Sequence, residues 1–274
     1  MVSAVKLRYG SEWLDLFVAL IVFLLIMAFL TFITAGIACC WITFALLMTG
    51  VFAYIANTKF SEKQRASPQN MVPLYYLVQV AGERLEMKMP AVYVDASPQV
   101  NAYARGIISP IIVLNTGLLK IMEEEEVLFV IGHEMGHVKL RHTALKTLFE
   151  SGMVSLPWYL YIPMYLFRLL FLHGRMSRSM EYSADRAGLY ACNDLEAAVR
   201  VLLKLKTESA YLDPDMVWNA LSMRLKVEDK PGLSDDISRL LSSHPDTADR
   251  INKLVQYSRD TGVGWKWWKA GYTG

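Results

Sequence analysis

Two histidines and a glutamate stand at a spacing that can hold a metal ion. The sequence around them reads Gly-His-Glu-Met-Gly-His, with His133 and His137 four residues apart. In a helix, residues four apart share one face, so the two imidazoles can offer one nitrogen each to the same ion. Glu134 then projects beside the ion, where it can accept a proton from water. Burying three such groups without a ligand is costly, which favours a metal site over a surface helix that carries them by chance.

A catalytic zinc site also needs a third protein ligand. Metzincins use a third histidine six residues after the second, but that position is Thr143, and Leu140 stands where their pattern has glycine. His142 would lie about 140° around a helix from His137. It is therefore expected to point away from the ion, at the surface near the end of the helix.

The favoured third ligand is Glu181. It lies in the segment Ser177–Gly188, whose many small residues permit tight packing of a helix. Asp185 follows one turn later on the same face, where it is suited to accept the free N–H of a metal-bound imidazole. An exposed acidic helix would explain this segment taken alone. Beside the two histidines, the pattern favours one Zn²⁺ per chain on His133, His137 and Glu181, with Glu134 as general base.

The helix expected to carry the histidines runs from Glu123 to His142. It opens with four glutamates, where a helix N-terminus favours negative charge, and continues with apolar residues. Gly132 and Gly136 weaken a helix, and here they are expected to allow close approach of backbone or substrate. Short strands are expected nearby at Val92–Asp95 and Ile111–Asn115.

An apolar segment precedes this part of the chain. Leu16–Ala56 is 41 residues long and contains no Asp, Glu, Lys or Arg. It fits two membrane spans of about 20 residues with a turn near Gly36, whereas a single span would leave about half of it in water. A cleaved signal peptide would be shorter.

Basic residues flank this apolar segment on both sides, and positive charge marks the cytoplasmic face of a membrane. They are Lys6, Arg8, Lys59, Lys63 and Arg65. The expectation is a multi-pass protein of the inner cell membrane. Residues 1–65 form a transmembrane helical hairpin and linker, and residues 66–274 form a domain that faces the cytoplasm.

A second apolar segment, Ser151–Leu172, is interrupted by Pro157 and Pro163. If residues before and after it bind one ion, it must cross the membrane an even number of times or not at all. Two crossings need about 40 residues, and this segment has 22. It is therefore expected to be re-entrant, interfacial or buried in protein, as a membrane-associated insertion at residues 151–174.

The composition excludes several other classes of protein. Lys and Arg number 28 against 26 Asp and Glu, so no basic field indicates a nucleic-acid partner. Three cysteines, two of them adjacent, do not make a disulfide-stapled secreted scaffold. A hydrophobic content of 54% is too high for a disordered chain.

Together these features resemble the family of HtpX-type membrane heat-shock proteases and CAAX prenyl endopeptidases, zinc proteases of the gluzincin type. The resemblance rests on His133–His137, on the pair Glu181 and Asp185, and on the apolar N-terminal region. Residues 101–104, Asn-Ala-Tyr-Ala, are similar to the family's Asn-Ala-Phe-Ala element. Residues 243–251 are similar to its His-Pro motif. The insertion departs from the HtpX pattern, where it resembles two further spans.

The resemblance implies a fold that is mainly α with a small β-sheet, an α+β zincin-like catalytic domain. It implies an edge strand in which Asn101, Ala102 and Tyr103 bind substrate, and it makes His244 a candidate catalytic residue. Asn101 and His244 would contact the substrate or the developing oxyanion, with a turn asparagine and a helix-capping histidine as the alternatives.

The implied activity is that of a membrane-anchored zinc endopeptidase that hydrolyses membrane or misfolded proteins in quality control. Its expected partners are protein or peptide substrates and the lipid bilayer. Two alternatives stay open. One is a prenyl-protein (CAAX) processing protease with the same mechanism. The other is a non-catalytic membrane scaffold that keeps a structural zinc.

Overall fold

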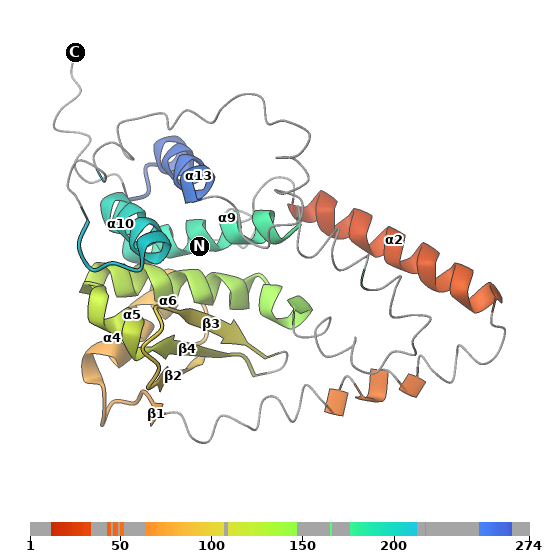
Figure 1. Cartoon of the computed structure of the whole chain (residues 1–274), viewed down its shortest axis with the longest axis horizontal. Coiled ribbons are helices and arrows are strands. Elements are labelled where there is room, and N and C mark those ends of the chain that lie inside the picture. Colours follow the sequence, from red (N-terminus) through yellow and green to blue (C-terminus); the bar gives the residue numbers. More distant parts are fainter. Residues whose placement is uncertain are drawn as a thin grey trace, which may run out of the picture.

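A small mixed sheet covered by helices forms the body of the protein (Figure 1). The computed structural model describes residues 12–33, 43–44, 46–48, 50–51, 64–106, 109–146, 165, 176–212, 217 and 247–264. The strands are β1 (Gln64–Arg65), β2 (Ala91–Asp95), β3 (Ala102–Arg105) and β4 (Ile111–Asn115). The helices are α2 (Glu12–Ile33), α4 (Val72–Arg84), α5 (Thr116–Ile121), α6 (Glu124–Lys139), α9 (Met176–Cys192), α10 (Leu195–Thr207) and α13 (Thr247–Thr261).

The strands follow the order β1-β2-β4-β3. β2 runs parallel to β4, and the two outer strands are antiparallel to their neighbours. The side chains of Ile112, Val113 and Leu114 are fully buried, as is typical of a central strand covered on both faces. The expected strands are confirmed, and the expected edge strand is β3, which lies beside α6.

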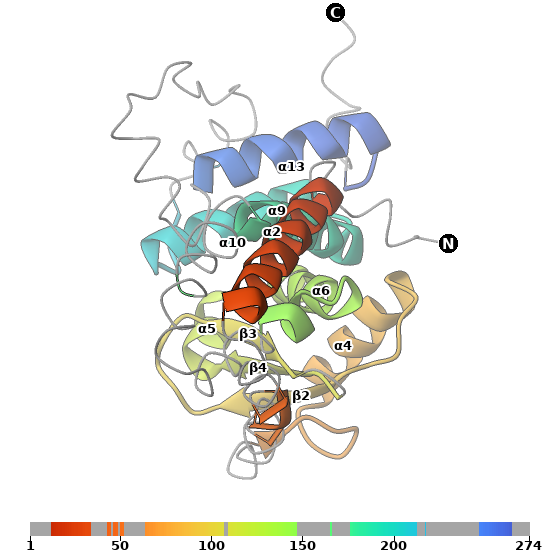
Figure 2. The ribbon, with the colours of Figure 1, turned by 90° about the vertical axis from the view of Figure 1, so that its right-hand side faces the viewer.

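The helices lie in successive layers on this sheet. α6 packs between the sheet and α9, and α13 lies on the far side of α9 (Figures 1 and 2). Phe129, Ile131 and Met135 of α6 are all but inaccessible to solvent. α6 is thus a central helix of the core rather than a surface helix, which gives its polar residues fixed surroundings.

A buried ion-pair cluster fixes the start of α6. Glu126 is fully buried, and its carboxylate accepts hydrogen bonds from Lys204 Nζ at 2.7 Å and Arg200 Nε at 2.9 Å. The same carboxylate accepts the backbone N–H of Glu123 at 2.8 Å, as in a capping box. One of the four expected N-terminal glutamates therefore ties α6 to α10.

α2 docks against the first turn of α9. Asp15 is buried and accepts a hydrogen bond from Ser179 Oγ at 3.1 Å, and Ala19 packs near Met176. The rest of α2 carries exposed apolar side chains. They are Trp13, Leu14, Phe17, Val18, Leu20, Ile21, Leu24, Leu25 and Phe29.

Among the residues that the structure describes, no helix combines the length and the apolarity that crossing a bilayer requires. Residues 34–42 and 52–63, which include much of the expected hairpin, lie outside the described residues. So does the expected insertion at residues 151–174, apart from Tyr165. The hairpin and the insertion stay predictions.

Candidate metal centre

Close packing between α6 and α9 brings the two halves of the site together. A Cβ added to Gly132 would lie 2.3 Å from the Cβ of Ala191, and one added to Gly136 would lie 2.6 Å from that of Ala187. Ordinary carbon contacts are about 3.5–4.0 Å. The two glycines therefore allow the approach of a neighbouring helix, which was one of the two roles expected of them.

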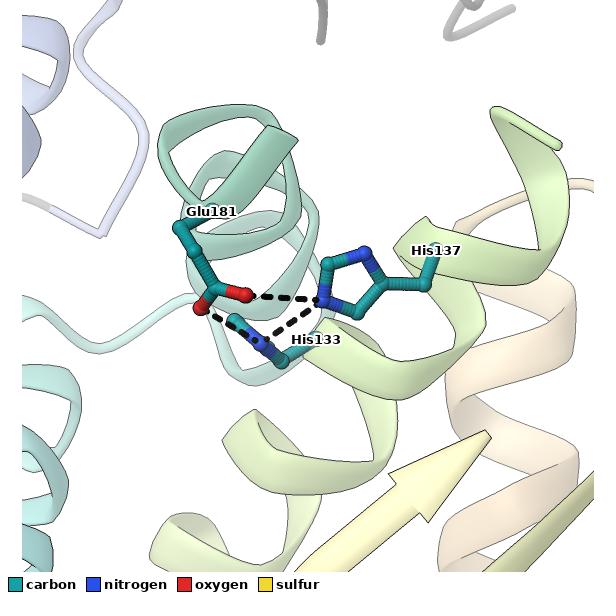
Figure 3. Close-up of side chains that lie close together, drawn as sticks. All are labelled: His133, His137 and Glu181. Carbon is teal, nitrogen blue, oxygen red and sulfur yellow. Dashed lines mark hydrogen bonds and ion pairs between the residues drawn. The ribbon is translucent and has the colours of Figure 1, made fainter. Parts of the chain in front are cut away.

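Three candidate ligand atoms converge where these helices meet (Figure 3). The Nε2 atoms of His133 and His137 are 3.2 Å apart, and each lies 3.6 Å from an oxygen of Glu181. Ligands at 2.0–2.1 Å from a tetrahedral Zn²⁺ are about 3.3–3.4 Å from one another. The two imidazoles and the carboxylate thus fit a tetrahedral ion with little adjustment.

The outer nitrogen of His133 meets a carboxylate. His133 Nδ1 lies 3.0 Å from Asp185 Oδ1, and Arg250 on α13 donates to both oxygens of Asp185, from Nε at 2.8 Å and Nη2 at 2.5 Å. Burial alone would raise the pKa of Asp185, but the charge and hydrogen bonds of Arg250 hold it at about 2. Asp185 is therefore an anion that orients His133.

The expectation that His142 lies at the surface is wrong. α6 ends at Lys139, and Arg141 adopts a left-handed conformation with φ of 65°, so the helix does not carry His142 around its axis. The turn instead brings His142 back against His137, with their Nδ1 atoms 3.0 Å apart. His142 is buried, not at the surface.

Burial sets the proton affinity of the site. It lowers the pKa of His137 well below its usual value, helped by the neighbouring His133 and His142, and so favours the neutral form that binds metals. For His133, burial also lowers the pKa, but Asp185 outweighs it and the pKa is raised. The pKa of Glu134 is raised by burial and by the charge of Glu181, while a backbone hydrogen bond from Ala104 on β3 opposes the rise.

The remaining predicted residues lie on or next to β3 or outside the described residues. Asn101 is exposed just before β3, and its carbonyl oxygen accepts the N–H of Asn115 at 3.0 Å. Ala102 and Tyr103 are on β3, and the backbone of Ala104 on the same strand hydrogen-bonds to Glu134. His244 lies outside the described residues.

Sequence reasoning missed Arg250 as a member of the site. Its Nη1 lies 3.5 Å from Glu181, and its contacts with Asp185 make it the counter-ion of the buried acidic pair. The sequence does indicate that some cation is needed, because two carboxylates one turn apart in a closely packed helix require a buried positive charge. Only the fold shows that this cation comes from α13.

Two histidines and a glutamate placed so that they could hold one ion, with a further buried glutamate beside them, are typical of a metallopeptidase site. The chain belongs to peptidase family M48, whose sequence model matches residues 75–258. It is similar to a protease HtpX homolog of Thermodesulfovibrio yellowstonii, with 27% identity over 79% of this chain and 89% of that protein. An HtpX homolog of Streptococcus mutans is 26% identical over 93% of this chain and 92% of its own length.

A third relative is the plastoglobule-localized metallopeptidase 48 of Arabidopsis thaliana. It is 32% identical over 70% of this chain and 59% of its own length. The chain is therefore an HtpX-like metalloprotease, as the sequence motifs predicted.

Proposed function

We propose that the chain is a zinc-dependent endopeptidase whose ion is held by His133, His137 and Glu181. The observation that carries this proposal is that the Nε2 atoms of the two histidines lie 3.2 Å apart and that each lies 3.6 Å from one of the two oxygens of Glu181. Two imidazoles and one carboxylate are a ligand set of catalytic zinc, with a fourth position left for water or substrate. When bound, zinc supplies a Lewis acid that polarises a carbonyl group and lowers the pKa of water.

Glu134 is the proposed general base. Its carboxyl group is buried beside His133 and Glu181, and its raised pKa brings its proton affinity closer to neutral pH. The backbone hydrogen bond from Ala104 fixes the orientation of the carboxylate. Glu134 can thus take a proton from the attacking water and pass it to the leaving amine.

The edge of β3 is the proposed binding site for the peptide. β3 ends the described sheet, so its outer edge pairs with no described strand, and its Ala104 lies next to Glu134. An extended substrate can add to such an edge by backbone hydrogen bonds. In this arrangement Asn101, Ala102 and Tyr103 contact substrate, and His244, which precedes α13 in sequence, donates to the developing oxyanion.

The decisive variant is Glu134→Gln. We expect it to keep its fold and its bound zinc but to lose proteolysis by roughly 100- to 10 000-fold, because the amide cannot accept the proton. Glu125→Gln, at an exposed position of the same helix, is the matched control and should keep full activity. Undiminished cleavage by Glu134→Gln would reject Glu134 as the base.

The proposed location is the inner cell membrane, with the catalytic domain toward the cytoplasm. The apolar segment Leu16–Ala56 supports this proposal, as do the exposed apolar side chains of α2.

In a background without Cys39 and Cys40, Phe29→Cys should react with a water-soluble maleimide only after detergent is added. Tyr211→Cys should react in broken cells but not in intact ones, and labelling of Tyr211→Cys from outside intact cells would contradict this orientation.

The proposed substrates are membrane or misfolded proteins, in a quality-control role. Similarity to proteins named as HtpX homologs supports this class. Purified protein should cleave casein-like unfolded chains faster than prenylated CAAX peptides. The reverse preference would indicate prenyl-protein processing, and bound zinc without cleavage of either would indicate a scaffold.

A further inference from the structure

The two histidines of the metal centre present the same nitrogen to the ion. The Nε2 atoms of His133 and His137 face each other at 3.2 Å, so each ring turns its Nδ1 outward. At His133 this outer nitrogen meets the Asp185 carboxylate, and at His137 it meets Nδ1 of His142 at 3.0 Å. The centre therefore has two outer contacts of different chemistry, one to a carboxylate and one to an imidazole.

The protons on the imidazoles determine what the second contact can be. A ligand nitrogen must carry a lone pair, so a neutral His137 that binds through Nε2 carries its hydrogen on Nδ1. That N–H points at His142 Nδ1, which can accept it only if His142 carries its own hydrogen on Nε2. One arrangement of hydrogens thus satisfies both rings and the ion.

We propose that His142 is a positioning residue of the metal centre, which accepts a hydrogen bond from His137 Nδ1 and so fixes the orientation and tautomer of this ligand. The proposal rests on the metal site proposed above. His142 does for His137 what Asp185 does for His133, but it adds no negative charge to a site that already contains Glu181 and Asp185. Partners of this kind typically change metal affinity 10- to 100-fold.

Two features of the structure fix the contact between His137 and His142. His142 is only 4% exposed, so water does not readily replace it as the acceptor. Its position depends on the end of α6 at Lys139 and on the left-handed conformation of Arg141, which turns the chain back toward His137. The contact between the two rings is made by their Nδ1 atoms, 3.0 Å apart, with ring centroids 5.2 Å apart and planes at 65°.

The test measures the zinc affinity of the purified full-length chain in detergent, by competition with a chelator of known affinity. His142→Leu removes the acceptor and should bind zinc 10- to 100-fold more weakly than the wild type. His142→Asn places an amide oxygen near the position of Nδ1 and should restore most of the affinity. Thr143→Val, at the adjacent buried position, is the matched control and should bind zinc as the wild type does.

A second readout separates orientation from general loss of structure. Substitution of Co²⁺ for zinc gives a visible absorption spectrum that depends on the ligands and their geometry. The spectrum should change in His142→Leu and return toward the wild type in His142→Asn. If His142→Leu does not fold, His142→Gln is compared with His142→Asn. Glutamine places its amide near the position of Nε2, so it should bind zinc more weakly than asparagine.

The outcomes distinguish this inference from the proposed function. Absence of stoichiometric zinc in the wild-type protein rejects the proposed metal site itself. Tight zinc binding by the wild type, with equal affinity and an equal Co²⁺ spectrum in His142→Leu, overturns the role of His142 alone. Equal zinc affinity of the asparagine and glutamine variants overturns it as well.

Discussion

The contact between α6 and α9 can be tested by exchanging one methyl group between the two helices. Gly136→Ala places a Cβ 2.6 Å from the Cβ of Ala187, about 1 Å closer than ordinary carbon contacts. Overpacking of this kind costs about 1–3 kcal/mol, against a gain of about 1 kcal/mol because alanine favours a helix over glycine. We expect Gly136→Ala to lower the free energy of unfolding by about 0–2 kcal/mol.

The reverse change on the partner helix, Ala187→Gly, tests the same contact from the other side. Ala187→Gly alone should cost about 2 kcal/mol, from lost helix propensity and one lost buried methyl group. In the double variant the propensity terms cancel, and the nearest remaining atom to the new Cβ is the Cα of Ala184 at 3.2 Å. The double variant should therefore lie within about 1 kcal/mol of the wild type, whereas the single effects sum to about 2–4 kcal/mol, so the coupling between the two positions is about 2–4 kcal/mol.

Thermal unfolding in detergent measures these differences in stability. In a chain of this size, each kcal/mol shifts the midpoint temperature by about 2–4 °C. Zinc affinity should follow the same pattern. Moving α6 away from α9 separates His137 from Glu181, and the double variant should bring them back together. Gly82→Ala is the control for helix propensity, since its new Cβ meets first the flexible side chain of Met89. The reasoning would be refuted if the stability changes of the two single variants added up to that of the double variant. It would also be refuted if Gly136→Ala were more stable than the wild type and kept the same zinc affinity.

Three further outcomes test the polar contacts. Lys204→Met removes one partner of the buried Glu126 and should cost about 3 kcal/mol in chemical denaturation, whereas the exposed Lys206→Met should change stability by less than about 0.5 kcal/mol. Asp185→Asn should weaken zinc binding roughly 10- to 100-fold in chelator competition, and unchanged affinity would argue against its role at His133. In metal-free protein the pKa of Asp185 is about 2 against the usual 3.8, so its ionised form stabilises the fold above about pH 4 and that stabilisation is lost toward pH 2. A pH series of unfolding should show this loss in the wild type and a flatter dependence in Asp185→Asn.

The parts of the site that were predictable follow from local geometry. His133 and His137 share a face because any helix places residues four apart on one side. Glu181 and Asp185 are related in the same way, and the small residues around them indicate that their helix packs closely. The spacing within each pair needed no knowledge of the tertiary fold, whereas the meeting of the two pairs depends on the packing of α6 against α9.

The parts that were missed depend on how a helix ends or on contacts between distant segments. The position of His142 follows from a left-handed residue at Arg141, and arginine gives no sign of such a turn where a glycine would have done. Arg250 reaches Asp185 across 65 positions of sequence, a pairing set by the packing of α13 on α9. The strands Val92–Asp95 and Ile111–Asn115 could be predicted from the sequence, but the position of β4 between β2 and β3 follows only from the strand pairing.

The place of Arg250 in chain order has a consequence for biosynthesis. α6 and α9 leave the ribosome before α13, so the histidines and both acidic residues can meet while Asp185 still lacks its counter-ion. A buried carboxylate without its cation is costly, which disfavours the closed arrangement of α6 and α9 at that stage. We therefore expect His133, His137 and Glu181 to reach their final arrangement only when α13 is present to supply Arg250.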